Sequence, residues 1–387
     1  MAIENTRKLT VIGAGKIGKG IAEAALLAGY EVGLRDRTKT LVKRSLVSLT
    51  NTLKKSLTEN RISREQHNRI TKDLLHGSAV MKDALRGADI VVEAVPELLD
   101  LKKSIFKEID KSGPTQAILS TTTSTLSVTE IALSTKRPEK VLGLHFFSPV
   151  VLTKVVETVR GDHTDENTMI FAQKFCESLG KIPVRVNKDS PGFVVNRIQA
   201  PAGVLLGAIV DRGIALPEEI DALLIKLGKP MGHFKLLDIT GIDLSYETSN
   251  YFSTALSRDF APFSLMKRKV EAGEYGKKTG RGFYDWSKGT PDIDIDKATK
   301  KVDPKDLIAV QINEATKLIE WEITTADEID KAIVNITKTN EGPMGQAQRF
   351  KPAGLAKRLR RLSKEFKKAI FEPTCMICEG KYLTRQH

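Results

Sequence analysis

The first half of the chain alternates short apolar runs with longer stretches in which apolar residues recur at helical spacing. An apolar run at residues 8–12 leads into a glycine turn, and further strand-like runs begin near residues 30, 90, 117 and 141. Helical patterns such as 101–111 and 127–133 lie between them. Strands that alternate with helices predict an α/β domain built on a doubly wound, mostly parallel sheet.

One segment departs from this alternation. Residues 38–72 are polar, with leucines at helical spacing, and they are longer than a simple crossover between two strands requires. We therefore expect a helical excursion that leaves the sheet and returns to it.

After Val186 the pattern becomes mainly helical and repeats itself. A helix is expected over 193–211, with a kink at Pro201. The sequence Pro-Glu-Glu-Ile-Asp at 217–221 is echoed by Ala-Asp-Glu-Ile-Asp at 326–330, and in both copies a long apolar helix precedes these residues and Pro-Met-Gly follows them. This echo predicts an all-α region made of two related helical units, the second of them degenerate.

These patterns divide the chain into three predicted parts. We expect an α/β domain over 1–188, a helical domain over 189–290 and a second, degenerate helical unit over 300–387. The charged segment 292–303, which has a proline near each edge, is the expected linker between the helical units.

The glycine turn after the first strand carries the first chemical signal. Gly13 allows a tight turn, Gly15 allows the backbone to approach a pyrophosphate closely, and Gly18 allows the following helix to pack on the strand. Lys16 and Ile17 lie within the same turn, where the helix N-terminus favours phosphate. A strand, a glycine turn and a helix in this order predict a Rossmann-type nucleotide-binding domain.

A carboxylate at the end of the second strand bears on the choice of cofactor. Asp36 lies where it would accept hydrogen bonds from an adenosine ribose, and it would repel a 2′-phosphate. The sequence therefore favours NAD over NADP, although the neighbouring Arg35 and Arg37 weaken the exclusion of NADP.

Further along the chain, His145 and Glu157 lie on successive apolar runs. Imidazole, with a usual pKa of about 6.5, can accept a hydroxyl proton near neutral pH, and a carboxylate can fix its tautomer and stabilise the imidazolium. The pair is therefore a candidate proton-transfer dyad. Glu97, Ser124 and His145 all fall at the carboxyl ends of predicted strands, where doubly wound sheets place functional residues.

Composition narrows the class of protein only in part. The 387 residues are 41% hydrophobic, and no apolar run approaches the roughly 20 residues of a membrane helix. The strand pattern begins by Lys8 and the chain has only three cysteines, so we expect a cytoplasmic protein with no membrane association. We interpret the C-x-x-C pair of Cys375 and Cys378 as structural or incidental, because further zinc ligands at matching spacing are missing.

The net charge of +13 favours anionic ligands in general, including nucleic acid, phosphorylated metabolites and acidic membranes. Basic residues are densest over 351–368, where leucines recur at helical spacing. We interpret this cluster as the solvated face of an amphipathic helix and expect no nucleic-acid partner.

Taken together, the motifs resemble the 3-hydroxyacyl-CoA dehydrogenase family, and the resemblance extends over essentially the whole chain. The shared motifs are Gly13 to Ala22, Val92 to Glu97, Thr122 to Leu126, His145 to Pro149, Pro191 to Arg197, Gly228 to Gly232 and Gly276 to Tyr284. Two positions differ from the family pattern: Ser148 and Thr122 stand where asparagine is usual. Both residues keep hydrogen-bonding capacity but have a shorter reach.

The resemblance implies a role for each catalytic candidate. It makes His145 the general base that removes the 3-hydroxyl proton and Glu157 the residue that orients it. It makes Ser124 the hydroxyl that binds the reacting oxygen and Asn196 an amide donor to that oxygen or to the thioester.

It also implies binding residues on other elements. Glu97 and Lys102 match positions near the nicotinamide and its ribose, so they join the cofactor-binding set. Ser48 and Lys55, on the helical excursion, match positions that contact coenzyme A in the family.

The function we expect is reversible, NAD-dependent oxidation of (S)-3-hydroxyacyl-CoA to 3-oxoacyl-CoA, with a short acyl group such as 3-hydroxybutyryl. Two alternatives stay open: a dehydrogenase of free 3-hydroxy or sugar acids, and a non-catalytic NAD-binding relative. Since family members with two helical units can pair them within one chain, either a monomer or a homodimer is expected.

Overall fold

The computed structural model describes residues 6–383. The chain divides into two compact units. The first contains the chain up to Phe193 together with residues 322–324 and 331–340. The second contains 194–321, 325–330 and the chain from Glu341 onward, so both helical copies contribute to it.

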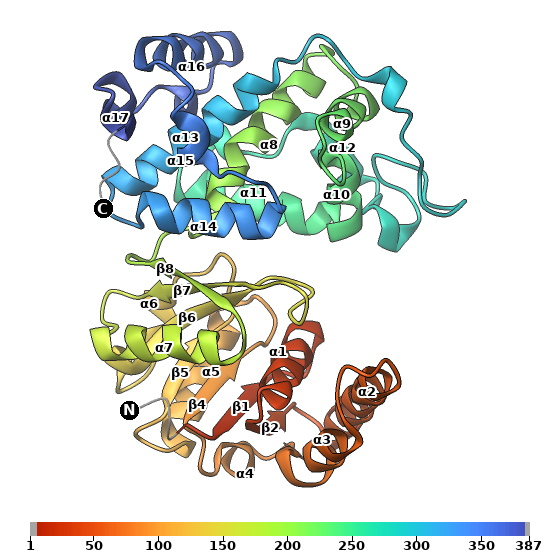
Figure 1. Ribbon diagram of the computed structural model, residues 1–387, viewed down its shortest axis with the longest axis vertical. Helices are drawn as coiled ribbons and strands as arrows, with labels where there is room; N and C mark the ends of the chain where they lie inside the picture. The colour runs from red at the N-terminus through yellow and green to blue at the C-terminus, as the bar shows by residue number, and fades with distance from the viewer. Residues whose placement is uncertain (1–5, 384–387) are drawn as a thin grey trace. The chain divides into compact units, whose positions relative to one another are not determined.

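The first unit is built on one eight-stranded sheet of order β3-β2-β1-β4-β5-β6-β7-β8 (Figure 1). Every neighbouring pair is parallel except β6 with β7, which is antiparallel. The strands are β1 (Lys8–Ile12), β2 (Glu31–Arg35), β3 (Leu75–Ser78), β4 (Ile90–Glu93), β5 (Ile118–Thr121), β6 (Val141–Phe146), β7 (Val155–Arg160) and β8 (Ile182–Val186). The expected mostly parallel, doubly wound sheet is confirmed.

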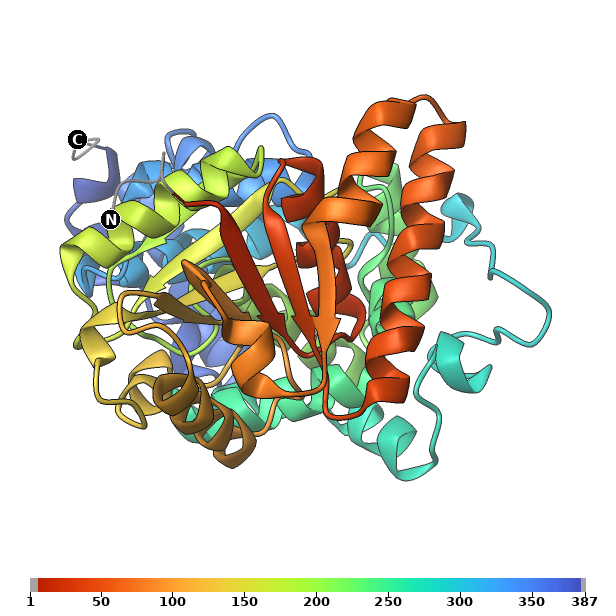
Figure 2. The same ribbon diagram turned by 90° about the horizontal axis from the view of Figure 1, so that it is seen from below.

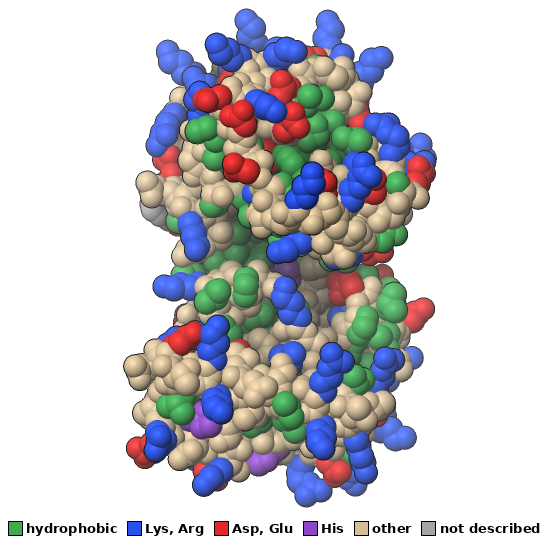
Figure 3. Space-filling view, turned by 90° about the vertical axis from the view of Figure 1, so that its right-hand side faces the viewer, with side chains coloured by type: hydrophobic (Ala, Val, Ile, Leu, Met, Phe, Trp, Pro, Cys, Tyr) green, Lys and Arg blue, Asp and Glu red, His purple; other side chains and the backbone are tan. Residues whose placement is uncertain are grey.

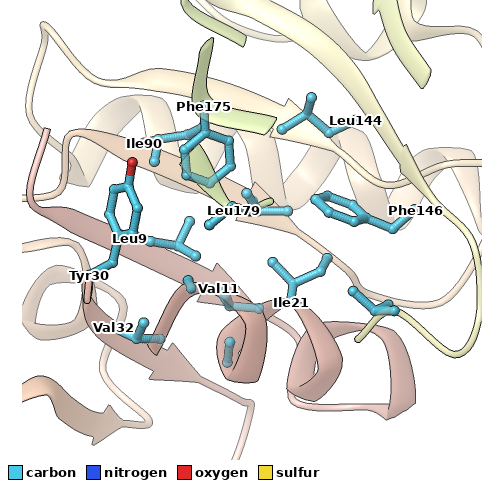
Figure 4. Packing of buried hydrophobic residues seen from close by; sticks show 14 of the residues in the cluster. Leu9, Val11, Ile21, Tyr30, Val32, Ile90, Leu144, Phe146, Phe175 and Leu179 are labelled. Atoms are coloured by element: carbon cyan, nitrogen blue, oxygen red, sulfur yellow. The ribbon is translucent and has the colours of Figure 1, made fainter. Parts of the chain in front are cut away.

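Helices cover both faces of this sheet, so its central strands β4, β5 and β6 are buried on both sides. The helices of the first unit include α1 (Lys16–Leu27), α4 (Met81–Leu85), α5 (Leu99–Ser112), α6 (Val128–Ala132) and α7 (Glu166–Ser178). Leu9 and Val11 of β1 pack in one core with Ile21 of α1 and Phe175 of α7 (Figure 4). The alternate residue Ile12 packs in a second core with residues of α4, α5 and α6.

The expected helical excursion is a pair of helices, α2 (Lys39–Thr58) and α3 (Arg64–Arg69), that continues into a π-helical turn (Ile70–Leu74). Figure 2 shows α2 and α3 side by side next to the sheet. Strand β3 and the short α4, which follow these helices, were not predicted from the sequence. Strand β3 is an edge strand whose central residues, His76 and Gly77, are exposed, so it has no apolar signature.

The second unit is helical. Its longer helices are α8 (Val195–Asp211), α9 (Pro217–Lys226), α10 (His233–Thr240), α11 (Ile242–Ala255), α12 (Ser264–Glu271), α13 (Pro304–Glu320) and α16 (Pro352–Phe366), with the short α15 (Pro343–Ala347) and α17 (Cys375–Cys378). Helix α14 (Ala326–Thr337) has residues in both units. Pro201 lies inside α8. No helix within residues 6–383 combines the length and apolarity needed to cross a membrane.

A shared capping device relates the two helical copies. Asp221 accepts hydrogen bonds from the backbone N–H groups that begin α10, at 2.9 and 2.8 Å, and Asp330 accepts two from the start of α15, both at 2.8 Å. A Cβ at the N-cap residue, Gly232 or Gly342, would collide with the corresponding aspartate. The equivalent glycines are therefore Gly232 and Gly342. The Pro-Met-Gly echo pairs Gly232 with Gly345, which is wrong by one turn of helix.

The first long helices of the two copies, α8 and α13, pack against each other through a buried ion pair. Arg197 Nε lies 2.5 Å from Glu314 Oε1, and the two side chains are 2% and 1% exposed. The guanidinium also stacks over the Trp321 ring, 5.4 Å from its centroid. Lys317 Nζ also lies 3.2 Å from Glu314 Oε2. Both charges of the Arg197–Glu314 pair are removed from water, so each needs a compensating charge close by.

We predict that Arg197→Met lowers the free energy of unfolding by about 3 kcal/mol, the lower end of the range for breaking a buried ion pair, because Glu314 keeps only Lys317 as its partner. Urea denaturation measures the change. The double variant Arg197→Met, Glu314→Leu should recover most of this loss, since apolar pairs often replace buried ion pairs without cost. A single variant as stable as the wild type would contradict the role of the pair.

His233, the first residue of α10, gives the second unit a pH dependence. It packs on the Phe234 ring, and desolvation lowers its pKa from 6.5 to about 4. The stability linked to neutral His233 is complete above pH 6.5 and is lost as the pH falls toward 4. We expect the melting temperature of His233→Gln to fall less than that of the wild type over this interval. Parallel curves for the two proteins would show that His233 does not contribute.

Candidate active site

The glycine turn packs so closely that two of its glycines admit no side chain. Gly13 has φ of +102°, and a Cβ there would lie 2.5 Å from the carbonyl oxygen of Ala94, the residue that follows β4. At Gly18 a Cβ would lie 1.9 Å from the carbonyl oxygen of Gly13. These contacts hold α1 tightly against the end of β1.

Gly15, by contrast, faces open space: a Cβ built there meets nothing within 4 Å. It is the N-cap residue of α1, and no side chain caps this helix. Lys16 and Ile17 begin the helix beside it. An uncapped helix N-terminus behind an open glycine suits a pyrophosphate, so these residues fit the phosphates of a dinucleotide cofactor.

Asp36, at the end of β2, is tied to the same turn. Its Oδ2 accepts a hydrogen bond from the Ala14 N–H at 3.0 Å, and its Oδ1 accepts one from the Arg37 N–H at 2.7 Å. These bonds hold a partly exposed carboxylate beside the glycine turn, where an adenosine ribose would meet it.

The change of strand direction at β6 and β7 brings His145 and Glu157 together. The two residues are direct partners in the antiparallel register. His145 Nδ1 lies 2.5 Å from Glu157 Oε2, and the side chains are 7% and 0% exposed. With Nδ1 paired to the carboxylate, Nε2 is the ring nitrogen left to take a proton.

Two aromatic rings lie against His145, and a buried lysine fixes the segment that follows β6. Phe147 and Phe193 place their ring centroids 4.3 and 5.7 Å from that of His145. Lys181, just before β8, donates from its Nζ to two carbonyls of the segment after β6, those of Val150 at 2.5 Å and Thr153 at 2.9 Å. Burial lowers the pKa of Lys181, so its proton is held by these carbonyls against the cost of desolvation.

A second charged cluster lies at the end of β4. Lys102 is fully buried, and its Nζ lies 2.8 Å from Glu93 Oε1, 3.3 Å from Glu97 Oε2 and 3.3 Å from the Val95 carbonyl. Glu93 also accepts hydrogen bonds from the Thr121 hydroxyl and the Val95 N–H, both at 2.7 Å. Burial raises the pKa of Glu93 in spite of these partners.

Glu97 joins this cluster to the loop that carries Ser124. Its Oε1 accepts hydrogen bonds from the Thr123 hydroxyl at 2.5 Å and the Ser124 N–H at 2.9 Å. Burial acts to raise its pKa, but the Lys102 ammonium and these hydrogen bonds outweigh burial and lower it. A carboxylate that stays ionised therefore fixes the backbone at Ser124.

The remaining sequence candidates lie on three elements. Lys102 belongs to α5, with its ammonium held inside the protein by two glutamates. Ser48 and Lys55 both lie on α2: Ser48 accepts a hydrogen bond from Lys19 Nζ at 3.0 Å, and Lys55 is exposed beside Glu59 at 3.7 Å. Asn196 lies in the first turn of α8, in the second compact unit.

Two buried residues that hold this site together, Glu93 and Lys181, had no role predicted from the sequence. Glu93 had a visible signal, because it is a lone charge within the apolar run of β4. Lys181 lies just before β8, far along the chain from the carbonyls that it binds, and its sequence surroundings give no comparable signal.

Two consecutive regions of the chain match one known enzyme family. Residues 8–190 match the NAD-binding domain of 3-hydroxyacyl-CoA dehydrogenases, and residues 192–286 match the C-terminal domain of the same enzymes. The chain belongs to the 3-hydroxyacyl-CoA dehydrogenase family. It is an NAD-dependent oxidoreductase that acts on a CH–OH group.

Individual members of the 3-hydroxyacyl-CoA dehydrogenase family are similar over different lengths. A 3-hydroxybutyryl-CoA dehydrogenase of Clostridioides difficile is 37% identical over 73% of this chain and all of its own length. The mitochondrial hydroxyacyl-coenzyme A dehydrogenase of Sus scrofa is 36% identical over 72% of this chain and 90% of its own. The crystal structure of a 3-hydroxybutyryl-CoA dehydrogenase from Escherichia coli K12 covers 98% of this chain and 99% of its own, with TM-score 0.89 and 25% identity.

We predict that two alanine substitutions in the glycine turn of this dehydrogenase affect different properties, one the stability and the other the affinity for NADH. Gly18→Ala should lower the melting temperature, because its Cβ meets the Gly13 carbonyl. Gly15→Ala should leave the melting temperature unchanged and weaken NADH binding at least tenfold, since its methyl group enters the open space before α1. Thermal unfolding and NADH fluorescence titration measure the two effects. Unchanged NADH affinity in Gly15→Ala would place the phosphates elsewhere.

Proposed function

We propose that this enzyme oxidises (S)-3-hydroxyacyl-CoA to 3-oxoacyl-CoA reversibly, with a short acyl group such as 3-hydroxybutyryl. The observation that carries the proposal is the buried contact between His145 and Glu157 in the same sheet that bears the glycine turn. Similarity to enzymes named 3-hydroxybutyryl-CoA dehydrogenase supports the substrate class. The short chain length rests on those names alone.

In the proposed reaction His145 is the general base. Its Nε2 accepts the proton of the 3-hydroxyl group while the Nδ1–H donates to Glu157. The Glu157 carboxylate is fully buried, so its charge offsets the imidazolium with little screening by water. In the reverse direction the same imidazolium returns the proton to the carbonyl oxygen.

NAD bound at the glycine turn supplies the acceptor for the hydride that leaves C3 of the substrate. The protein's own contribution is to position the substrate oxygen. Ser124, whose backbone is fixed by Glu97, donates its hydroxyl to that oxygen, and Asn196 donates an amide N–H to it or to the thioester. Neutral donors suit an oxygen whose charge changes during the reaction.

The proposed binding residues are those that the family resemblance implies, and the geometry of the glycine turn and of Asp36 supports them. Gly13, Gly15, Lys16, Ile17 and Gly18 hold the pyrophosphate. Asp36 binds the ribose and disfavours NADP.

Glu97 and Lys102 act beside the nicotinamide ribose, and the burial of Lys102 makes Glu97 the member that faces the cofactor. Ser48 and Lys55 lie seven residues apart on α2, on one face of the helix, and bind coenzyme A.

A test of the proposal measures NADH oxidation at 340 nm with acetoacetyl-CoA. We expect wild-type turnover with NADH, much weaker turnover with NADPH, and a fall of about 10²–10⁴-fold in kcat for His145→Gln, the range of general acid–base catalysis. Glu157→Gln should lose less, because Nε2 remains. His163→Gln, at an exposed position of the same unit, is the matched control and should keep full activity.

The same assay separates the alternatives. Turnover of free acetoacetate without coenzyme A would replace the proposal with a dehydrogenase of free 3-hydroxy acids. NAD binding without turnover of either substrate would favour a non-catalytic relative. Full activity in His145→Gln would remove the dyad from the mechanism.

A further inference from the structure

The second helical unit contains a hollow that the proposed reaction does not use. It has a volume of about 580 Å³ and lies where α13, α15 and α16 meet. Its volume falls within the roughly 300–1,000 Å³ of typical small-molecule sites. All of its lining residues belong to the second compact unit, so the site is complete within it.

The charge of the lining residues has one sign. Four are basic, and among the residues 6–383 that line the hollow none is acidic: Lys305, Arg349, Lys351 and Arg358. By contrast, Lys and Arg side chains are scattered over the face of the molecule in Figure 3, interspersed with acidic ones. A concave wall of one sign raises the local concentration of ligands of opposite charge.

Two of these four charges are already compensated. Arg358 pairs with Asp303 at 2.7 Å and with Asp306, and Arg349 pairs with Glu341 at 2.5 Å. Lys305 and Lys351, by contrast, have no ion pair within residues 6–383. The hollow therefore presents two lysine ammonium groups that can receive a phosphate group.

The rest of the wall suits an uncharged ring. Phe350 and Ile308 supply apolar surface, and Gln346 supplies an amide that can both donate and accept hydrogen bonds. At the N-terminus of α16, Lys351 occupies the N-cap position, and no side chain caps the first turn. Phosphates at the lysines and a ring against Phe350 would use both halves of the wall.

We propose that this hollow binds a nucleoside polyphosphate, independently of the catalytic reaction. A long polyanion such as RNA fits the same observations less well. The exposed lysines of α16, such as Lys357 and Lys364, lie outside the hollow, whereas Phe350 lines it beside Lys351, so the hollow itself suits a ring joined to phosphates.

The test is isothermal titration of the full chain with ATP, at saturating NADH so that the cofactor site is filled. We expect Lys305→Ala, Lys351→Ala to weaken ATP binding at least tenfold. The matched control is Lys357→Ala, Lys364→Ala, which removes the same charge from exposed positions of α16 outside the hollow and should bind ATP as the wild type does.

A third variant keeps every charge. Gly354 lines the hollow, and a Cβ there meets no atom within 4 Å, so Gly354→Leu should fold normally and lose ATP binding by filling the space. Tripolyphosphate should bind the wild type at least fivefold more weakly than ATP, because it lacks the ring.

Four results would overturn the proposal: no ATP binding at millimolar concentration, unchanged affinity in both hollow variants, an equal loss in the control pair, or tripolyphosphate binding as tightly as ATP. Tighter binding of a short RNA than of ATP would point to the nucleic-acid alternative and would also count against the proposal.

Coenzyme A carries the same kind of nucleotide, so its affinity for the hollow variants is measured as a second experiment. Coenzyme A affinity that falls in the hollow variants would assign the hollow to that molecule, and unchanged affinity would assign it to a free nucleotide.

Discussion

The candidate active site around His145 depends on a single change of strand direction in the sheet, between β6 and β7. All neighbouring strands run parallel except β6 and β7, and only an antiparallel pair can place residues of successive strands directly opposite one another across a short connection. This register sets Glu157 against His145 with both side chains buried. The parallel strands before this point bring the glycine turn and the loop of Ser124 to the same, carboxyl, edge of the sheet.

Buried charge gives this edge its rigidity. Lys102 lies between two glutamates, one of which fixes the backbone at Ser124, and Lys181 holds the segment after β6 through its carbonyls. Each ammonium group is costly to bury, so its partners must be in place for the chain to fold. Folding and the geometry of the site are therefore coupled: the ion pairs that make the charges tolerable also set the positions of the loops.

The sequence predicted what depends on local pattern. Alternating apolar runs indicated the sheet, Gly13 and Gly18 indicated a turn that the structure packs against backbone, and spacing on successive strands indicated the pairing of His145 with Glu157. Features that depend on distant contacts were missed. Strand β3 has exposed central residues and no apolar signal, Lys181 binds carbonyls about 30 residues away, and the Pro-Met-Gly echo was misaligned because the aspartate caps set the true correspondence.

The central claim is that Glu157 holds His145 in the tautomer that leaves Nε2 free to take a proton. The most direct test is the side-chain ¹⁵N spectrum of the labelled protein, in which the signal of His145 among the six histidines is assigned by its loss in His145→Gln. We predict neutral imidazole with the proton on Nδ1 and an unprotonated Nε2. A neutral ring with its proton on Nε2 would contradict the account, because that nitrogen could not then act as the base.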